Sequence, residues 1–333
     1  MMEQRIEFID LAKGICILLV VLIHVFGETS GEVIQMMILF RMPLYFILSG
    51  LFFKTYEGVF CFFKKKVNKL IIPFFCSYLF VLPTNYILNR FIEKENDFLF
   101  FVEFGRLNLE FNGVSWFLIC LFIVNLYFYI MFILCRHNIK WISLCTCICG
   151  IVGYSLNTYG FYLPMWMDTS LTVMPFFLFG YAMRKYSNIL YGKFSSKSIL
   201  CFIGSLSILL VVHYYIKYTQ NGIVGFDDNN FDIGILPLYI GGLSGTCCVL
   251  MVAKYFTRLP VFSYIGRYSI VVLLTHMIYL FVFRNILYHW GIDQSSYFLN
   301  SLVFIIIVIL SLPTIKFCVR FLPYCFAQKD LWK

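Results

Sequence analysis

Ten long apolar stretches follow one another along the chain, separated by shorter polar or basic segments. Their lengths approach the roughly 20 residues that an α-helix needs to cross the hydrocarbon core of a bilayer. The pattern therefore predicts an all-α bundle of about ten transmembrane helices. The predicted spans are Leu11–Phe26, Val33–Phe53, Leu70–Leu88, Ser115–Cys135, Trp141–Leu156, Ser170–Met183, Ser198–Tyr218, Ile233–Ala253, Ser269–Ile286 and Tyr297–Ile315.

Composition supports the same class of protein. Hydrophobic residues make up 61% of the 333 residues and charged residues 13%, with a mean hydropathy of +0.84. A soluble domain cannot bury that much apolar surface. No long polar segment is left over for a separate soluble domain, so we expect one domain over residues 1–333.

The charge distribution sets the expected orientation. The net charge is +9, and most of the 26 Lys and Arg residues lie on the same side of the predicted spans as the N-terminus. By the positive-inside rule both termini are then cytoplasmic. The excess of cations indicates topology and contact with anionic membrane lipids rather than nucleic-acid binding. We expect a multi-pass protein of the plasma (inner) membrane.

The 13 cysteines form no zinc-type pattern, and nearly all lie in predicted spans or on the cytoplasmic side. There cysteine usually serves as a small packing residue. We therefore expect no metal site and no disulfide framework. The first apolar segment has no small-residue cleavage site, so we interpret it as a span that is retained.

A polar stripe runs along the first predicted span. With about 100° of rotation per residue, one helix face carries Asp10, Lys13, Ile17, Val20, His24 and Glu28. Ionisable groups are costly in hydrocarbon, so they normally face protein or a water-filled cavity. Lys13 and His24 lie roughly 16 Å apart at the α-helical rise, which puts a cation near the cytosol and an imidazole towards mid-membrane. We expect this face to form one wall of an active site, as a slot open to the cytosol.

His24 is the leading catalytic candidate. A neutral imidazole can take a proton from a hydroxyl and return it to a leaving group near pH 7. The alternative is a packing histidine bonded to a neighbouring helix. Glu28, one turn further on, either orients the ring or is an exposed acid at the end of the span, and Asp10 lies on the same stripe below Lys13.

Arg41 lies about two turns into the second span, too deep to reach the outer surface easily, so it needs a partner or a polar cavity. It could bind a sugar hydroxyl or stabilise developing negative charge. The alternative is a structural salt bridge, for instance with Asp168 or Glu28. Pro43 predicts a local kink, and Ser49–Gly50 predicts close helix packing.

A basic run precedes the third span, with Lys64, Lys65, Lys66 and Lys69 ahead of Pro73. Four ammonium groups at the cytoplasmic mouth would suit a polyphosphate ligand. Flanks of this kind are also common simply because of topology. Two further residues are weaker candidates: Trp116 is typical of an interfacial anchor, and His276 has no charged neighbour on its own helix.

Together these residues resemble the acyltransferase 3 family of integral membrane acyltransferases, in particular the branch of fucose 4-O-acetylases. The similarity extends from about residue 5 to residue 315. It rests on Ile9-Asp-Leu-Ala-Lys-Gly with His24, Met42-Pro-Leu-Tyr-Phe-Ile-Leu-Ser-Gly50, the basic run into Leu70-Ile-Ile-Pro73, Ser115-Trp-Phe-Leu118, Pro175-Phe-Phe-Leu-Phe-Gly180, and Ile265-Gly-Arg-Tyr-Ser-Ile with His276.

The resemblance implies transfer of an acyl group, usually acetyl from acetyl-CoA, to a hydroxyl of a carbohydrate in the bacterial cell envelope, such as capsule, O-antigen or exopolysaccharide. The arginine and essential histidine of the family's first span correspond to Lys13 and His24. Its Arg-x-x-Arg corresponds to Lys66 and Lys69. Lysine still binds phosphate, but as a point charge rather than a two-pronged fork.

The resulting hypothesis assigns each candidate a role. Lys13, Lys66 and Lys69 bind the phosphates of acetyl-CoA, and His24 acts as general base or carries the acetyl group itself. Asp10, Glu28 and Arg41 support it, while Trp116, Asp168 and His276 are possible contacts to the carbohydrate, either a polysaccharide or a lipid-linked saccharide. The alternatives are a non-enzymatic transporter or flippase of envelope glycans, and an inactive relative that acts as a membrane sensor.

Overall fold

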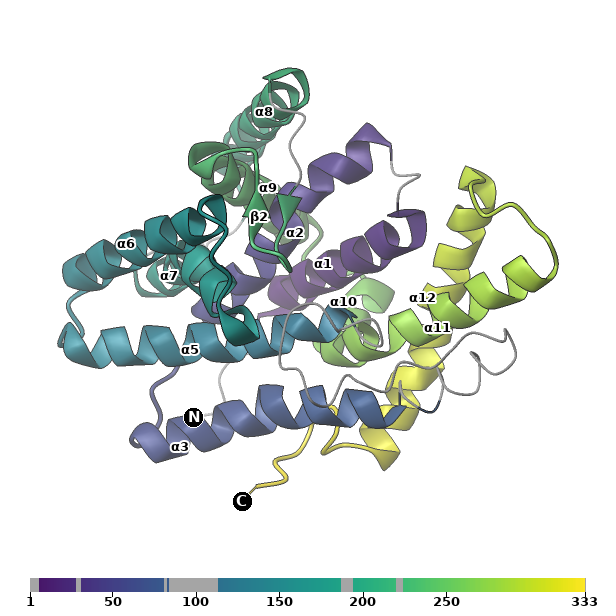
Figure 1. Cartoon of the computed structure of the whole chain (residues 1–333), viewed down its shortest axis with the longest axis horizontal. Helices are drawn as coiled ribbons and strands as arrows, with labels where there is room; N and C mark the ends of the chain where they lie inside the picture. The colour runs from purple at the N-terminus through teal and green to yellow at the C-terminus, as the bar shows by residue number, and fades with distance from the viewer. Residues whose placement is uncertain are drawn as a thin grey trace.

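A computed structural model describes residues 6–27, 31–80, 83, 113–186, 194–219 and 224–332 (Figure 1). These residues form a helical bundle with one short β-hairpin. Following the orientation expected from the charge distribution, we call the end of the bundle that carries the hairpin the outer side and the end that carries both termini the cytoplasmic side. The elements are α1 (Glu7–Phe26), α2 (Glu32–Leu51), α3 (Val59–Lys66), the π-helical turn η2 (Val67–Ile71), η5 (Gly113–Ser115), α5 (Trp116–Leu134), α6 (Ile139–Thr158), η6 (Pro164–Trp166), α7 (Met167–Tyr186), α8 (Ser196–Thr219), β1 (Val224–Gly225), β2 (Asn230–Phe231), α9 (Ile235–Phe256), α10 (Pro260–Arg267), α11 (Ser269–His289) and α12 (Tyr297–Phe321).

The described helices confirm the predicted all-α membrane bundle. Nine of the ten predicted spans coincide with a helix, and the third continues helically from η2 to residue 80, where its described part ends. Within the described residues, eight helices are long and apolar enough to cross a membrane. The helix α7 has similar length but is more polar, with Asp168 in its first turn and Arg184 and Lys185 in its last. The short helix α10, which begins at Pro260, was not predicted.

The helix α1 lies at the centre of the bundle (Figure 1). It packs against α2, α9, α10, α11 and α12. About 67% of its apolar window is buried, against 11% for the peripheral helix α8. The polar stripe of α1 is therefore surrounded by protein, whereas α8 presents most of its surface to the bilayer.

Very close backbone contacts hold α1 against α10. A Cβ atom at Gly14 would overlap the carbonyl oxygen of Phe262, and one at Gly266 would overlap the carbonyl oxygen of Asp10. Both positions therefore need glycine, because no side chain fits between the two helices. The glycines at the ends of two motifs named above thus serve packing.

The same holds where α2 meets α7. A Cβ atom at Gly50 would overlap the carbonyl oxygen of Phe177, and one at Gly180 would overlap that of Ile47. These glycines end the Met42–Gly50 and Pro175–Gly180 motifs. Their contacts fix the helix that carries Arg41 relative to the rest of the core.

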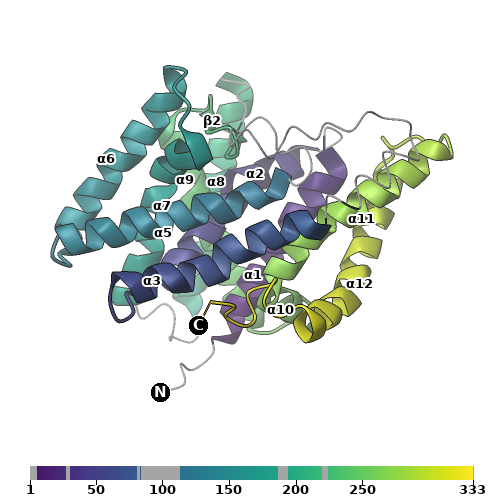
Figure 2. The same ribbon diagram turned by 60° about the horizontal axis from the view of Figure 1, so that its bottom comes forward.

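Two segments close the ends of the bundle. On the outer side β1 and β2 pair antiparallel, with Val224 opposite Phe231. On the cytoplasmic side the chain leaves α12 and runs back towards α3 (Figure 2). Each segment lies beside one of the candidate regions described next.

Candidate active site

His24 and His276 lie against each other in the bundle. Their ring centroids are 5.5 Å apart and the ring planes are inclined by 42°. His24 is partly exposed in the last turn of α1, and His276 is fully buried on α11. His24 therefore lies at the end of α1 opposite Lys13, next to His276.

His276 has one ring nitrogen bonded and the other available. Its Nδ1 lies 2.8 Å from the backbone oxygen of Val272, which can only accept a hydrogen bond, so Nδ1 carries the proton. Its Nε2 is buried and has no hydrogen-bond partner among the described residues. A buried polar atom without a partner is costly. This nitrogen is therefore suited to accept a hydrogen bond from a substrate, or from His24 after a change in the position of its ring.

Arg41 adds a cation to the two imidazoles. It lies close enough to His24 and His276 for electrostatic interaction with both. Its Nε is buried without a hydrogen-bond partner, and its guanidinium forms no ion pair with any residue that the structure describes. The salt bridge to Asp168 considered above is not formed, and Glu28 lies outside the described residues.

The acidic group that interacts with Arg41 is Asp227. Asp227 lies in the turn between β1 and β2, and its backbone oxygen accepts a hydrogen bond of 2.8 Å from Nε1 of Trp166. Sequence reasoning did not single out Asp227, because nothing in the sequence brings this turn close to Arg41 on α2.

Two other predicted outer residues, Trp116 and Asp168, are buried near the elements that contact the hairpin. Trp116 is buried, with its ring centroid 6.3 Å from that of Trp166, and Asp168 is fully buried in the first turn of α7. Asn229 secures the hairpin by accepting a hydrogen bond of 2.8 Å from Thr172. Neither Trp116 nor Asp168 is therefore openly exposed to a ligand.

Lys13 lies at the opposite end of α1. Its ammonium is 4.5 Å from the ring centroid of Phe52, at the end of α2, and Asp10 lies one turn below, against α10. Between Lys13 and His24, Ile17 and Val20 are only 0% and 4% exposed. The expectation of an open slot along this face was wrong, because neighbouring helices pack against it.

Lys66 is a half-buried cation at the cytoplasmic mouth. Its ammonium lies 5.3 Å from the centroid of Phe62, and it forms no hydrogen bond or ion pair with a described residue. Burial lowers its pKa to about 8. A bound anion would offset the cost of this burial, because a nearby opposite charge favours the charged form of lysine.

A pocket of about 500 Å³ opens beside these lysines, with aromatic and basic walls. Its lining includes Phe53, Lys54, Tyr56, Tyr181, Arg184 and Lys185. The Phe53 ring contacts the ring of Phe62, over which the Lys66 ammonium lies. The backbone oxygen of Phe53 accepts a hydrogen bond of 3.3 Å from Arg184. Sequence reasoning missed this pocket because its walls come from the turn after α2 and the end of α7.

Lys69 faces a different part of the molecule from Lys66. Its ammonium donates a hydrogen bond to the backbone oxygen of Ala327 and lies 3.9 Å from the carboxylate of Asp330. The two lysines predicted to act together are therefore divided between two surfaces of the helix.

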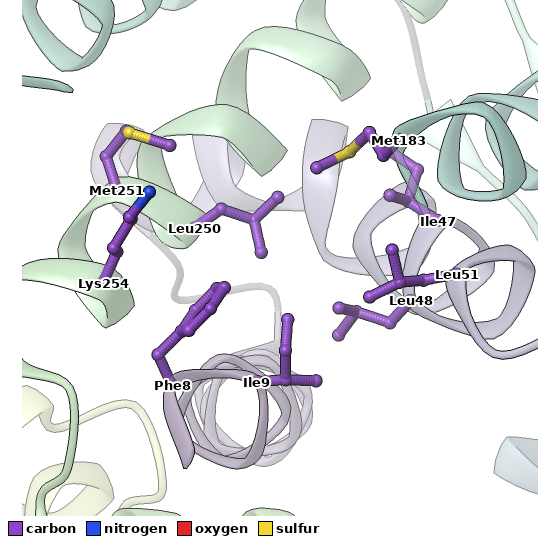
Figure 3. Close-up of a pocket in the computed structure, with 9 residues that line it drawn as sticks. All are labelled: Phe8, Ile9, Ile47, Leu48, Leu51, Met183, Leu250, Met251 and Lys254. Carbon is purple, nitrogen blue, oxygen red and sulfur yellow. The ribbon is translucent and has the colours of Figure 1, made fainter. Parts of the chain in front are cut away.

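A second cavity is shown in Figure 3. Eight of its nine lining residues are apolar or sulfur-containing, and Lys254 is the ninth. It holds about 10 Å³ of free space, room for at most one water molecule. None of the predicted site residues lines it, so it is a packing defect near the cytoplasmic end of α1.

Comparison with known proteins identifies the family. A family model described as an acyltransferase domain matches residues 6–315. No curated protein and no solved structure gives a match. The matched range includes the histidine pair, Arg41 and the basic run, on the membrane helices described above. The chain belongs to the acyltransferase 3 family and is a multi-pass membrane acyltransferase.

Proposed function

We propose that this protein is an O-acetyltransferase that moves an acetyl group from cytoplasmic acetyl-CoA to a hydroxyl of a cell-envelope carbohydrate. The observation that carries the proposal is the cluster of His24, His276 and Arg41 in a chain of this family. The two histidine rings lie 5.5 Å apart, and Nε of Arg41 and Nε2 of His276 are buried without a hydrogen-bond partner among the described residues. Groups left unpaired in a protein interior are typical of sites that bind and transform a substrate.

In the direct route, the sugar hydroxyl attacks the carbonyl carbon of the thioester while His24 takes the hydroxyl proton. The carbon–sulfur bond then breaks, and the proton passes to the sulfur, which leaves as free coenzyme A. Arg41 stabilises the negative charge on the carbonyl oxygen, because a desolvated guanidinium acts most strongly where charge develops.

In the relay route, His24 itself attacks the thioester and becomes an acyl-imidazole, which the sugar hydroxyl then cleaves. His276 lies close enough to take or return a proton in this route. Both routes yield the same ester and free coenzyme A, and both need His24.

The donor enters from the cytoplasmic mouth in this proposal. The pocket beside Phe53 offers aromatic surface for a purine and cations for phosphates. Lys13 and Lys66 lie against Phe52 and Phe62, at the edge of that pocket. The pantetheine arm extends from there along α1 towards His24, which requires the packed face at Ile17 and Val20 to open during the reaction.

The acceptor approaches the other end of the bundle. Asp227 and Arg41 offer a carboxylate and a guanidinium to sugar hydroxyls, and the turn that holds Asp227 is bonded to Trp166, whose ring lies beside that of Trp116. The resemblance to fucose 4-O-acetylases favours a sugar hydroxyl as acceptor. A donor from the cytosol and an envelope acceptor place the protein in the plasma membrane.

The test uses purified protein, acetyl-CoA with a labelled acetyl group, and envelope polysaccharide from cells that lack the gene. Wild-type protein is expected to transfer label to polysaccharide, and His24→Ala to lose transfer by about 10²–10⁴-fold, as for removal of a general base. The matched control is His289→Ala, an exposed histidine at the end of α11.

Transfer by His24→Ala at the wild-type rate would falsify the assignment. A transporter or flippase predicts a different result, which is movement of glycan across the membrane of proteoliposomes without label on the sugar.

A further inference from the structure

The segment after α12, Leu322–Trp332, folds back under the bundle and lies along α3 and η2 (Figures 1 and 2). We call it the C-terminal segment. It takes no part in the chemistry proposed above, yet it contacts the basic run that the sequence assigned to the acyl donor.

The end of the C-terminal segment is held by a two-way amide pair. Nδ2 of Asn68 donates to the backbone oxygen of Trp332, and the backbone N–H of Trp332 donates to Oδ1 of Asn68, both at 2.8 Å. Asn68 is only 1% exposed. The Asn68 side chain thus binds the segment as a neighbouring peptide group would.

Next to this pair, a carboxylate of the chain lies between two lysines. Asp330 forms a hydrogen-bonded ion pair with Lys65, and its other oxygen lies 3.9 Å from Lys69. The hydrogen bond from Lys65 lowers the pKa of Asp330, so the carboxylate is ionised at neutral pH. Lys69 also donates to the backbone oxygen of Ala327.

The contacts differ in strength along the segment. Phe326 is 2% exposed and its ring stacks on Phe80 with centroids 5.9 Å apart, which makes it a firm anchor. The Lys65–Asp330 pair is partly open to solvent, with side-chain exposures of 45% and 25%. Ion pairs of this kind contribute little to stability. For the part beyond Phe326 to lift, this ion pair and the hydrogen bonds to Asn68 and Lys69 must break, while the anchor at Phe326 can remain in place.

We propose that the C-terminal segment is an internal ligand of the basic run, with Asp330 occupying the place of a phosphate group between Lys65 and Lys69. Phosphate and carboxylate are both oxyanions that accept hydrogen bonds from ammonium groups, so each can fill this site. A phosphorylated ligand then binds Lys65 and Lys69 only when the segment lifts. The inference rests on the proposed function, because it takes acetyl-CoA as that ligand.

Lys66 explains how a donor could begin to bind while the segment is in place. Lys66 lies against Phe62, away from the segment, and forms no ion pair with a described residue. The donor meets this cation first and recruits Lys65 and Lys69 as the segment leaves. The apparent affinity is then lowered by the fraction of molecules in which the segment is closed.

The experiment measures the Kd of labelled coenzyme A for the purified full-length protein by equilibrium binding. Asp330→Asn is expected to bind about two- to fivefold more tightly than wild type, the range expected from loss of one partly exposed ion pair. Trp332→Ala, which removes the ring beside Phe60, should act in the same direction. The control, Asp293→Asn, makes the same charge change in an exposed turn after α11 and should leave the Kd unchanged.

If Asp330→Asn binds coenzyme A as tightly as wild type or more weakly, the C-terminal segment is not an internal ligand, and the proposed function is unaffected. If neither wild type nor the variant binds coenzyme A, the proposed donor is wrong and the inference falls with the proposed function.

Hydrogen exchange at the backbone N–H of Trp332 separates two sources of phosphate. In nanodiscs of neutral phospholipid, adding coenzyme A should speed this exchange. Faster exchange with anionic phospholipid alone, and none with coenzyme A, would assign the site to a lipid headgroup and contradict the proposal.

Discussion

The polar groups near the two ends of α1 differ in whether they have interaction partners. At the cytoplasmic end most cations are occupied: Lys13 lies over Phe52, Lys65 is paired with Asp330, and Lys69 is bonded to Ala327. At the outer end, Nε of Arg41 and Nε2 of His276 are buried and lack hydrogen-bond partners among the described residues.

This difference indicates that the outer end carries the catalytic groups and the cytoplasmic end carries the groups that bind the donor. A buried polar group without a partner costs roughly 1–3 kcal/mol, so the outer cluster persists at the expense of stability. The cytoplasmic cations are partly solvated, and each contributes little on its own. We therefore expect changes at the outer end to lower kcat, and changes at the cytoplasmic end to alter KM for acetyl-CoA.

After substitution of His24, the largest fall in kcat is expected from substitution of Arg41. Arg41→Met should lower kcat by about 10²-fold, as for removal of one donor that stabilises a developing oxyanion, with little change in KM for acetyl-CoA. Arg41→Lys keeps the positive charge but loses the planar guanidinium that can donate two parallel hydrogen bonds, so it should retain an intermediate rate. Steady-state kinetics with both substrates varied measures the effect.

The matched control is Arg284→Lys. Arg284 also lies on a membrane helix, but its guanidinium is bonded to the backbone oxygen of Val25 at 2.5 Å. It should affect yield or thermal stability rather than kcat. If Arg41→Met instead raised KM for acetyl-CoA and left kcat unchanged, the division of roles between the two ends would be wrong.

His276 should have a smaller effect, because it acts through His24. His276→Asn retains an amide at the place of Nδ1 to bond Val272, but removes Nε2. We expect kcat to fall about tenfold, which corresponds to about 1.4 kcal/mol of transition-state stabilisation.

The companion variant is His276→Gln, whose amide reaches the place of Nε2 and should recover part of the rate. Equal activity of the two variants would show that only the space filled by the ring matters. The pH dependence of kcat should also change in His276→Asn, which a purely structural role does not predict.

Much of the fold could be predicted because length and polarity determine which segments can cross a bilayer. The stripe on the first span led to Lys13 and His24 as candidates, and the structure shows that this helix, α1, packs against five others. The pairing of His24 with His276 could not be predicted, because the sequence carries no information on which faces of α1 and α11 meet. The open slot was predicted wrongly, because a stripe on one helix does not reveal what packs against it.

The cytoplasmic end shows the same limit. The Lys64–Lys69 run was visible in the sequence, but its division between two surfaces depends on a segment more than 250 residues later, which brings Asp330 to Lys65 and Lys69. The close helix packing predicted at Ser49–Gly50 is confirmed, because Gly50 lies against the backbone carbonyl of Phe177. Gly14 belonged only to the family resemblance, and the structure gives it the same physical reason, since it lies against the backbone carbonyl of Phe262.

The smallest expected effect concerns Lys66 and depends on pH. Burial lowers the pKa of Lys66 to about 8, so its ammonium is charged below that pH and neutral above it. Affinity for a phosphorylated donor should therefore be full near pH 7 and fall as the pH rises through 8. We expect kcat/KM for acetyl-CoA to drop about fivefold between pH 7 and pH 9, as for loss of one charge contact of about 1 kcal/mol.

Lys66→Arg separates this cause from a general effect of alkaline pH. Arginine stays protonated throughout the range, so the variant should keep a nearly constant kcat/KM where the wild type declines. A parallel decline in both proteins would show that another group controls donor binding. His24 and the neighbouring Arg41 lie far from Lys66, at the outer end of the bundle. We therefore expect kcat at saturating acetyl-CoA to stay constant while kcat/KM follows the titration of Lys66.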